Sequence, residues 1–425
     1  MAPPLLRTHR IAAAMASLLL PAVLLALVIS GVAWAHPAEP VFSDTGPGAP
    51  AYGADRDYPM PDPPAAHLPT QEELVGWHSR YDRFRRMRTV PRGEATVAPL
   101  RRAGEEIDVV YPWEGRYRRL ADYLERNPVT GLLIARGDAI LYEHYRYGRT
   151  DEDRLLSQSM AKTLTGLLVG VALHEGAIRS LDDPAAAYVP ELAGTEYGAT
   201  PLHALLRMAS GVAFRETYGP DDDSTRLAAS LLWPGGVGAI EALRPFNTRV
   251  APAGARFAYS SAETEVLGLV VARATGVPLA EYLSMRIWRK IGAEADAAWA
   301  IDAGGQEVVF CCFVARLRDW ARLGLMLAHD GAWNGEQDVP REWLREMTTL
   351  SDGSRAGGYG YQVVVMAGGR RMFALLGIHG QAILVDPQSH LVMVQTAVRV
   401  RPAGDPASLE GGALWFALVA QHGSP

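Results

Sequence analysis

The chain has 425 residues, of which 48% are hydrophobic and 21% are charged. This composition supplies enough apolar material for one or two folded domains and excludes a chain that is disordered throughout. The net charge of -6 argues against nucleic acid or an anionic membrane surface as the main partner, because basic faces bind phosphate. Of the 41 basic residues, only Lys162 and Lys290 are lysines. Burial can lower the pKa of a lysine enough to remove its proton, whereas an arginine stays protonated. The role of each lysine is therefore considered separately.

The N-terminal segment has the pattern of an export signal. Arg7 and Arg10 precede an almost purely apolar run over residues 11–32, and residues 33–35 read Ala-Trp-Ala, which matches a cleavage site. We predict a signal peptide over residues 1–35 and a periplasmic or secreted protein. The apolar run approaches the length that spans a bilayer, so an uncleaved anchor, the only expected membrane contact, is the alternative.

The segment that follows the signal differs in composition from the rest of the chain. Residues 36–70 are rich in proline, glycine and aspartate, which is typical of an extended arm. Residues 71–102 are charged and arginine-rich and predict a solvated surface helix. We therefore assign residues 36–110 to a proline-rich arm with a surface helix, and residues 111–425 to the main domain.

The main domain begins and ends with sheet patterns. Residues 113–127 predict an amphipathic helix, and residues 131–148 predict two strands joined by a tight turn. Apolar spacing predicts a helix over 159–176, and a mostly helical middle extends to about residue 335. Strand patterns then alternate with glycine and proline turns up to about residue 397, before a last helix over 406–421.

These elements predict an α+β fold. The strands near both ends of the domain would form one antiparallel sheet flanked by helices, and the helical middle would pack as a second lobe. A cleft between the two parts is then the natural place for a ligand.

The two cysteines, Cys311 and Cys312, are neighbours in the chain. Neighbouring Cα atoms lie about 3.8 Å apart, below the usual disulfide range of roughly 4.4 to 6.8 Å. We therefore predict two small buried thiols, with a vicinal disulfide as the alternative. No histidine cluster lies near them, so no metal site is predicted.

A serine and a lysine three positions apart carry the first chemical signal. Ser159 and Lys162 would lie on one face of the helix over 159–176, one turn apart. A serine hydroxyl becomes a good nucleophile when a neighbouring base takes its proton, and a buried lysine can be that base. The spacing also arises by chance, so it is weak evidence alone. Lys290 has no serine at this spacing and is read as a structural cation near a helix end.

Two further segments add to this signal. Tyr259 ends a loop before a helical pattern, where its hydroxyl could relay a proton, although a packed aromatic is the ordinary alternative. Gly377 and His379 belong to the run Gly-Ile-His-Gly-Gln on an apolar strand pair, where small residues let backbone approach a ligand. A lone histidine in such a place is more often structural.

Together these segments resemble a known superfamily. The runs SQSMAKTLTGLLVG, LLRMASG, YSS and GIHGQ resemble the serine β-lactamase and penicillin-binding-protein superfamily. The runs SLDDPAAAYVPEL, SGVAFRETYG and CCFVARLRDWARLG are similar to class C β-lactamase-related hydrolases, especially the 6-aminohexanoate-dimer hydrolase type and its carboxylesterase relatives. The resemblance covers about residues 111–425.

The resemblance implies roles for individual residues. Ser159 would be the nucleophile that forms an acyl-enzyme, Lys162 its base and Tyr259 the proton relay. The backbone N–H groups of Ser159 and Ile378 would form the oxyanion hole.

Two more residues are candidate substrate contacts. Tyr218 resembles a mobile-loop tyrosine that closes on the substrate amide, with a surface aromatic as the alternative. His379 lies in the motif that carries the oxyanion hole and is the second candidate.

The sequence also departs from the β-lactamase pattern. Leu375 stands where the pattern has a lysine, and Ser261 replaces an asparagine. Both changes lower the expected activity on β-lactams and favour a simple ester or a linear amide. Arg370 or Arg371 is the alternative source of the missing cation, although their turn reads first as a solvated hairpin tip.

Three functions remain as hypotheses. We expect an exported serine hydrolase with a Ser/Lys/Tyr triad and a small-molecule amide or ester substrate. The alternatives are a D-Ala-D-Ala carboxypeptidase or β-lactamase of the same fold, and a non-catalytic cell-wall binding module. No cofactor is predicted, because the HExxH, Walker A and dinucleotide motifs are absent from the sequence. The GxSxG motif is absent too, which argues against an α/β-hydrolase.

Overall fold

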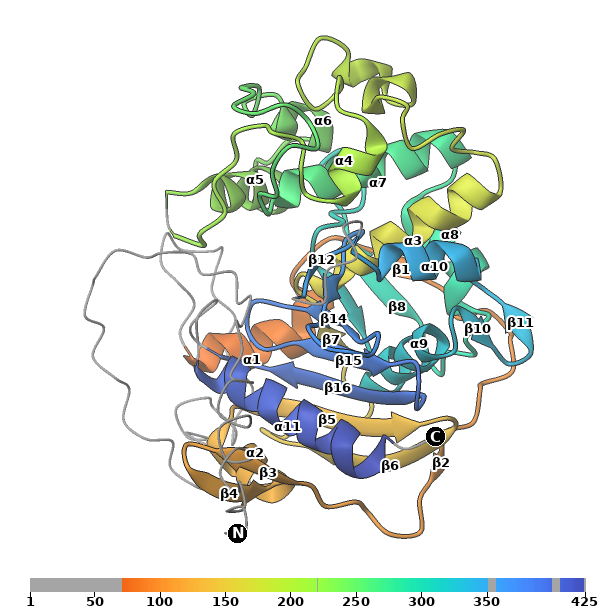
Figure 1. Ribbon diagram of the computed structural model, residues 1–425. Coiled ribbons are helices and arrows are strands. Elements are labelled where there is room, and N and C mark those ends of the chain that lie inside the picture. Colours follow the sequence, from red (N-terminus) through yellow and green to blue (C-terminus); the bar gives the residue numbers. More distant parts are fainter. Residues whose placement is uncertain (1–70, 220, 351–356, 400–405, 424–425) are drawn as a thin grey trace, which may run out of the picture.

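The computed structural model describes residues 71–219, 221–350, 357–399 and 406–423 (Figure 1). The predicted export signal and the proline-rich stretch over 36–70 lie outside the described residues. The described part combines a large mixed sheet, a smaller sheet and a group of helices, so the predicted α+β class is confirmed.

The large sheet has eight strands in the order β12-β13-β14-β15-β16-β5-β6-β2. All neighbours are antiparallel except β2 and β6, which are parallel. The strands are β2 (Arg101–Arg102), β5 (Val129–Arg136), β6 (Ala139–Tyr145), β12 (Gly358–Tyr359), β13 (Val364–Val365), β14 (Phe373–Leu376), β15 (Ala382–Asp386) and β16 (Leu391–Ala397).

The centre of this sheet joins distant parts of the chain. Strands β5 and β6 form the predicted hairpin, and β16 pairs with β5 so that Val394 lies opposite Leu133. The expectation of one sheet built from both ends of the domain is therefore confirmed.

Alternate residues of β5 bury themselves against two helical layers. Leu132 and Ile134 belong to the apolar cluster of α11 (Pro406–His422) and α2 (Leu120–Arg126). Leu133 and Ala135 belong to the cluster that contains α9 (Leu317–Ala328). The period of two explains this alternation, because successive side chains of a strand point to opposite faces. Figure 1 shows α11 crossing one face of the sheet.

The helical lobe lies at the top of Figure 1, at the end of the molecule opposite α11. Its long helices, α3 and α7, pack against each other and are almost wholly buried. The helices of the lobe and its borders are α3 (Met160–His174), α4 (Leu202–Leu206), α5 (Asp223–Leu232), α6 (Ala239–Leu243), α7 (Ser261–Thr275), α8 (Leu279–Leu283), η4 (Ser284–Trp288) and α10 (Arg341–Met347), with the short turns η2 (Ala185–Ala187) and η3 (Pro190–Leu192).

A second sheet of four strands has the order β1-β8-β9-β7. Its strands are β1 (Met87–Val90), β8 (Ala297–Ala300), β9 (Phe313–Ala315) and β7 (Leu155–Leu156). Two hairpins complete the described strands: β3 (Val110–Trp113) with β4 (Arg116–Arg119), and β10 (Ala332–Trp333) with β11 (Glu336–Gln337).

Two local expectations were wrong. The segment over 71–102 forms only a short helix, α1 (Gln71–Arg80), followed by η1 (Tyr81–Arg83) and then by strand β1. Leu74 and Val75 of α1 are buried, so this helix is not a solvated one. Residues 113–127 form the end of β3, strand β4 and the two-turn helix α2 rather than one long helix.

Within the described residues, no single helix is both long and apolar enough to cross a membrane. One pair of helices, Ser261–Thr275 and Leu279–Trp288, meets the length and composition criteria only when taken together, and it is bent by 76°.

Candidate active site

Ser159 stands at the N-terminus of helix α3 (Met160–His174) and is half-buried. The residue before it, Gln158, has a left-handed φ of 45°, which turns the chain sharply into the helix. Residues 160–172 are buried, so the helix is fixed by the core while its first turn meets the surface. The Ser159 hydroxyl is thus accessible at the positive end of a helix dipole.

The side chain of Lys162 reaches back one turn to this hydroxyl. Its Nζ donates hydrogen bonds to Ser159 Oγ at 3.0 Å and to the backbone carbonyl of Phe310 at 3.1 Å. The lysine is only 1% exposed. These two bonds fix the amine beside the serine, as the three-residue spacing predicts.

Burial also changes the protonation of this lysine. Desolvation lowers the pKa of Lys162 to about 8, because a buried ammonium loses its hydration. The carboxyl groups of Glu216 and Glu265 act in the opposite direction and raise this pKa. The amine can therefore be neutral near physiological pH, when it is able to accept a proton.

Tyr259 ends the loop before α7 and hydrogen-bonds to the Ser159 side chain. The Lys162 ammonium lies 4.9 Å from the centre of its ring, and the ring of Tyr359 packs edge-on against it at 5.8 Å. Burial, and secondarily Glu216, raises the pKa of Tyr259. Its phenol therefore stays neutral and can both accept and donate a proton. The structure brings Ser159, Lys162 and Tyr259 together.

The Gly377 turn lies next to the same serine. Strand β14 ends at Leu376, and a Cβ atom on Gly377 would lie 2.8 Å from the carbonyl oxygen of Ser157, so only glycine fits. Among the described residues, neither Ser159 nor Ile378 has an acceptor for its backbone N–H. Both N–H groups are therefore available to a ligand oxygen, as an oxyanion hole requires.

Tyr218 is held by a buried acid that the sequence reasoning missed. Its hydroxyl hydrogen-bonds to Glu216, and its own φ is 60°. Asp222 caps helix α5 and also accepts hydrogen bonds from the backbone N–H groups of Thr217 at 2.5 Å and Gly219 at 3.3 Å. The loop that carries Tyr218 is therefore ordered from both sides of that residue.

His379 is not at the surface of the site. It is 9% exposed, and its Nδ1 hydrogen-bonds to the carbonyl of Arg399 at 2.6 Å. Its ring centre lies 5.1 Å from that of His78. This geometry favours the structural alternative over a substrate contact.

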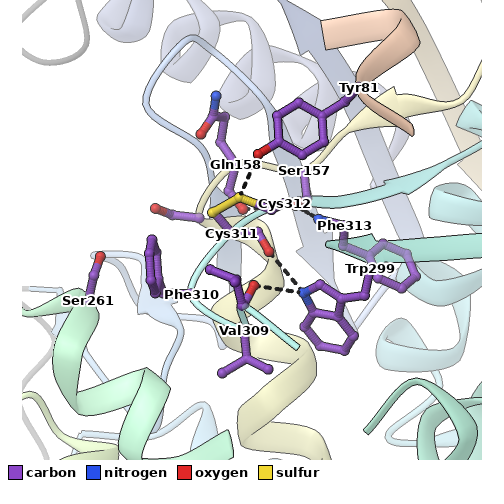
Figure 2. Close-up of a disulfide and its surroundings, with 12 residues drawn as sticks. Tyr81, Ser157, Gln158, Ser261, Trp299, Val309, Phe310, Cys311, Cys312 and Phe313 are labelled. Atoms are coloured by element: carbon purple, nitrogen blue, oxygen red, sulfur yellow. Dashed lines mark hydrogen bonds between the residues drawn. A yellow bond between two sulfur atoms is a disulfide. The ribbon is translucent and has the colours of Figure 1, made fainter. Parts of the chain in front are cut away.

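The two cysteines form a vicinal disulfide, so the prediction of two thiols was wrong. We favoured two thiols because the Cα atoms of ordinary disulfides lie farther apart than neighbouring Cα atoms do. Here the two Cα atoms lie only 3.7 Å apart, and the sulfur atoms are bonded nevertheless. Figure 2 shows the bridge between Gln158 and Trp299, with Tyr81 donating to Cys312 Sγ at 3.4 Å. The bridge directly follows Phe310, whose carbonyl binds the catalytic candidate Lys162.

Neither of the two arginines proposed as substitutes for the β-lactamase lysine is free to serve the site in the described part of the chain. Leu375 is buried, and both candidate arginines are engaged elsewhere. Arg370 pairs with Asp386, and Arg371 pairs with Asp330. The expectation that one of them could serve the site is therefore wrong. Lys290 lies 3.6 Å from Glu336 in a partly exposed ion pair, in agreement with a structural role.

Three supporting residues gave no sequence signal. Phe310 acts through its backbone carbonyl, which any residue supplies. Glu216 contacts Ser261 across 45 positions of sequence, and Glu265 accepts a hydrogen bond from the Val309 backbone. Such contacts depend on tertiary structure, so spacing could not reveal them. Within the described residues, no cluster of three or more His, Cys, Asp or Glu side chains is arranged to hold a metal ion.

Comparison of the sequence with known proteins gives a family match and a named relative. Residues 118–412 match the family model described as Beta-lactamase. The 6-aminohexanoate-dimer hydrolase of Paenarthrobacter ureafaciens is 29% identical over 310 residues, which cover 65% of this chain and 74% of the relative.

Solved structures share the fold. A Bacillus anthracis protein, assigned provisionally as a 6-aminohexanoate-dimer hydrolase, superposes with a TM-score of 0.73 at 23% identity, covering 82% of this chain and 95% of its own. EstCE1, a hydrolase with promiscuous acyltransferase activity, gives a TM-score of 0.56 at 15% identity, with coverage of 68% and 93%. At these identities the similarity concerns the fold alone.

Proposed function

The chain belongs to the β-lactamase family and is a hydrolase of that fold, and on this premise we propose that it is an exported serine hydrolase that cleaves an amide or ester bond through an acyl-enzyme. The observation that carries the proposal is the 3.0 Å contact between Ser159 Oγ and the buried amine of Lys162. A nucleophile in contact with a base of lowered pKa is the arrangement that covalent catalysis needs.

In the proposed acylation, the neutral amine of Lys162 takes the proton of Ser159 while Oγ attacks the substrate carbonyl carbon. The N–H groups of Ser159 and Ile378 then hold the negative oxygen of the tetrahedral intermediate. The leaving amine or alcohol departs after it receives a proton through Tyr259. A water molecule attacks the acyl-enzyme in the reverse sense, which releases the acid and restores the serine hydroxyl.

The electrostatics of the site support a neutral acyl group. Leu375 replaces the cation that would meet a β-lactam carboxylate, and Arg370 and Arg371 are held in ion pairs with Asp386 and Asp330. The aromatic rings of Phe257 and Tyr359, 5.4 Å apart, pack beside Tyr259 and supply apolar surface nearby. Short-chain esters and linear amides fit these surroundings better than an anionic β-lactam.

A substrate panel tests the proposal. The purified chain is assayed with p-nitrophenyl esters, linear amides of short ω-amino acids and one chromogenic cephalosporin, with Ser159→Ala as the control. We expect turnover of an ester or a linear amide that the Ser159→Ala variant lacks. Turnover of the cephalosporin alone, or equal turnover by the two proteins, would contradict it.

Export is a separate part of the proposal and depends on the sequence of residues 1–35. Its test is expression of the full chain followed by cell fractionation and sequencing of the N-terminus. A mature protein that begins at His36 outside the cytoplasm is the expected result. A cytoplasmic chain with an intact N-terminus would contradict export.

A further inference from the structure

The helix before the family-matched region contacts both segments that form the candidate active site. The family match begins at residue 118, yet α1 (Gln71–Arg80) brings His78 to within hydrogen-bond distance of Gln158 and Gln381. Gln158 directly precedes Ser159, and Gln381 closes the turn that carries Ile378. His78 is 3% exposed, so it belongs to the interior of the protein.

We propose that His78 is a positioning residue that holds the nucleophile Ser159 and the oxyanion-hole residue Ile378 in one fixed arrangement. It touches no reacting atom and acts through Gln158 and Gln381. This inference rests on the proposed serine hydrolase activity, and it assigns a function to a segment outside the family match.

The hydrogen bonds of His78 define one protonation state. The side-chain amide of Gln158 donates to His78 Nε2 at 3.3 Å, so Nε2 carries no proton. The proton is then on Nδ1, which donates to the carbonyl oxygen of Ala397 at 3.2 Å. Burial lowers the pKa of His78, and the nearby His379 lowers it further, which keeps the ring neutral.

The contact with Gln158 acts directly on the nucleophile. Gln158 has a left-handed φ of 45°, a conformation that a residue other than glycine adopts at a cost. Its backbone carbonyl accepts hydrogen bonds from the Ser157 hydroxyl at 2.9 Å and from the Ala161 N–H at 3.2 Å. The bond from its side chain to His78 adds a third fixed point. These bonds hold the turn that presents Ser159.

The second contact acts on the oxyanion-hole turn. Gln381 and His78 donate to the same acceptor, the carbonyl oxygen of Ala397, and the Gln381 amide lies 3.1 Å from that oxygen. The other end of the Gln381 amide accepts from the backbone N–H of His379 at 3.1 Å. The Gln381 carbonyl accepts from the Gly377 N–H at 2.8 Å. His78 therefore acts on the turn around Ile378 through the Ala397 carbonyl, the acceptor that it shares with Gln381, and it also packs against the Gln381 amide at 3.1 Å.

The same N-terminal segment has a second link to the site. The Tyr81 hydroxyl donates to Cys312 Sγ at 3.4 Å, in the loop that presents the Phe310 carbonyl to Lys162. Buried apolar side chains of α1, Leu74 and Val75, fix the helix in place. Helix α1 thus has both the rigidity and the contacts that a positioning element needs.

The test compares three variants of the full chain. His78→Phe keeps a ring but removes the hydrogen bonds to Gln158 and to the Ala397 carbonyl. His78→Gln restores an acceptor near the position of Nε2. Val75→Ala is the matched control, because Val75 is fully buried in the same helix and packs in a separate apolar cluster with Leu74, Tyr147 and Val398. Each variant is assayed with the ester or amide that the wild type hydrolyses, and its thermal unfolding is measured.

We expect His78→Phe to lower kcat by about tenfold or more with KM changed less than about twofold, because misplaced reacting groups slow the chemical step more than binding. His78→Gln should keep kcat within about threefold of the wild type, since it can still bind Gln158. Val75→Ala should lower the melting temperature and leave kcat and KM unchanged. A His78→Phe enzyme as fast as the wild type, or a His78→Gln enzyme as slow as His78→Phe, would overturn the proposal.

A measurement that needs no substrate separates this inference from the proposed activity. Amide hydrogen exchange over residues 157–162 and 377–381 should become faster in His78→Phe and not in Val75→Ala, because only the first loosens both segments. Unchanged exchange in His78→Phe would overturn the positioning role, whatever the substrate. A wild type without hydrolase activity but with the expected exchange pattern would refute the proposed function alone.

Discussion

Ser261 donates two hydrogen bonds to the buried carboxyl group of Glu216, from its backbone nitrogen at 2.6 Å and from its hydroxyl at 2.8 Å. The same carboxyl binds the hydroxyl of Tyr218 and raises the pKa of Lys162. Where related sequences of the β-lactamase pattern would have an asparagine, this chain thus has a serine that anchors an acid. Glu216 thus contacts both the loop tyrosine Tyr218 and the start of α7, and its charge acts on the pKa of Lys162.

The activity of the wild type should rise with pH. The general base is the neutral form of Lys162, and burial lowers the pKa of this residue to about 8. Below that pH the ammonium predominates, so kcat/KM, which reports the free enzyme, should fall as the pH decreases. The measurement is kcat/KM between pH 6 and pH 10 with a substrate that is stable over this range. A profile that is highest in the acid part of the range would contradict the role of Lys162.

Removing the charge of Glu216 should move this profile. The carboxyl of Glu216 raises the pKa of Lys162, so Glu216→Gln should lower the pKa further and shift the rising limb to lower pH. The glutamine keeps an acceptor for Ser261, which limits structural change. A shift to higher pH would show that Glu216 does not act on Lys162 through its charge. Thermal unfolding of the variant provides the control for folding.

Replacing Lys162 by arginine should abolish acylation although the positive charge remains. A guanidinium stays protonated at any workable pH and cannot accept the serine proton. We expect kcat/KM to fall by about 100-fold or more, as for the loss of a general base. Near-normal turnover by a folded Lys162→Arg variant would reject the base assignment. The melting curve of the variant distinguishes lost chemistry from lost folding, because the lysine is buried.

Tyr218→Phe should separate amides from esters. The hydroxyl of Tyr218 lies in the ordered loop beside the site and can support a leaving nitrogen, which needs more help to depart than an alcohol does. We expect kcat for a linear amide to fall by about tenfold and kcat for a p-nitrophenyl ester to change less than about threefold. Equal slowing of both substrates would reduce Tyr218 to a packing residue, and Tyr117→Phe on the exposed β3–β4 hairpin serves as a remote control.

Local spacing and the superfamily resemblance together predicted the candidate catalytic residues. The three-residue interval places Ser159 and Lys162 on one face of a helix, where the structure brings them into contact, and the hairpin over 131–148 follows from its alternation and its turn. The serine three positions before Lys162, which Lys290 lacks, also distinguishes the two lysines in the sequence alone. Contacts between residues this close in sequence depend mainly on local backbone geometry and little on the tertiary structure.

The supporting contacts were beyond the reach of the sequence. His78 meets Gln381 across 303 positions, and nothing in a charged N-terminal helix indicates which side chain becomes buried. The helix was expected to be solvated because its charges dominate its composition, yet Leu74 and Val75 are enough to bury one side of it. Position in three dimensions, rather than residue type, determines these roles.

Active-site labelling shows whether Ser159 is the nucleophile. The wild type and Ser159→Ala are treated with a fluorophosphonate probe, and the modified peptide is located by mass spectrometry. We predict stoichiometric labelling of the wild type at Ser159 and no labelling of Ser159→Ala. An unlabelled wild type, or equal labelling of the two proteins, would contradict the assignment of Ser159 as the nucleophile.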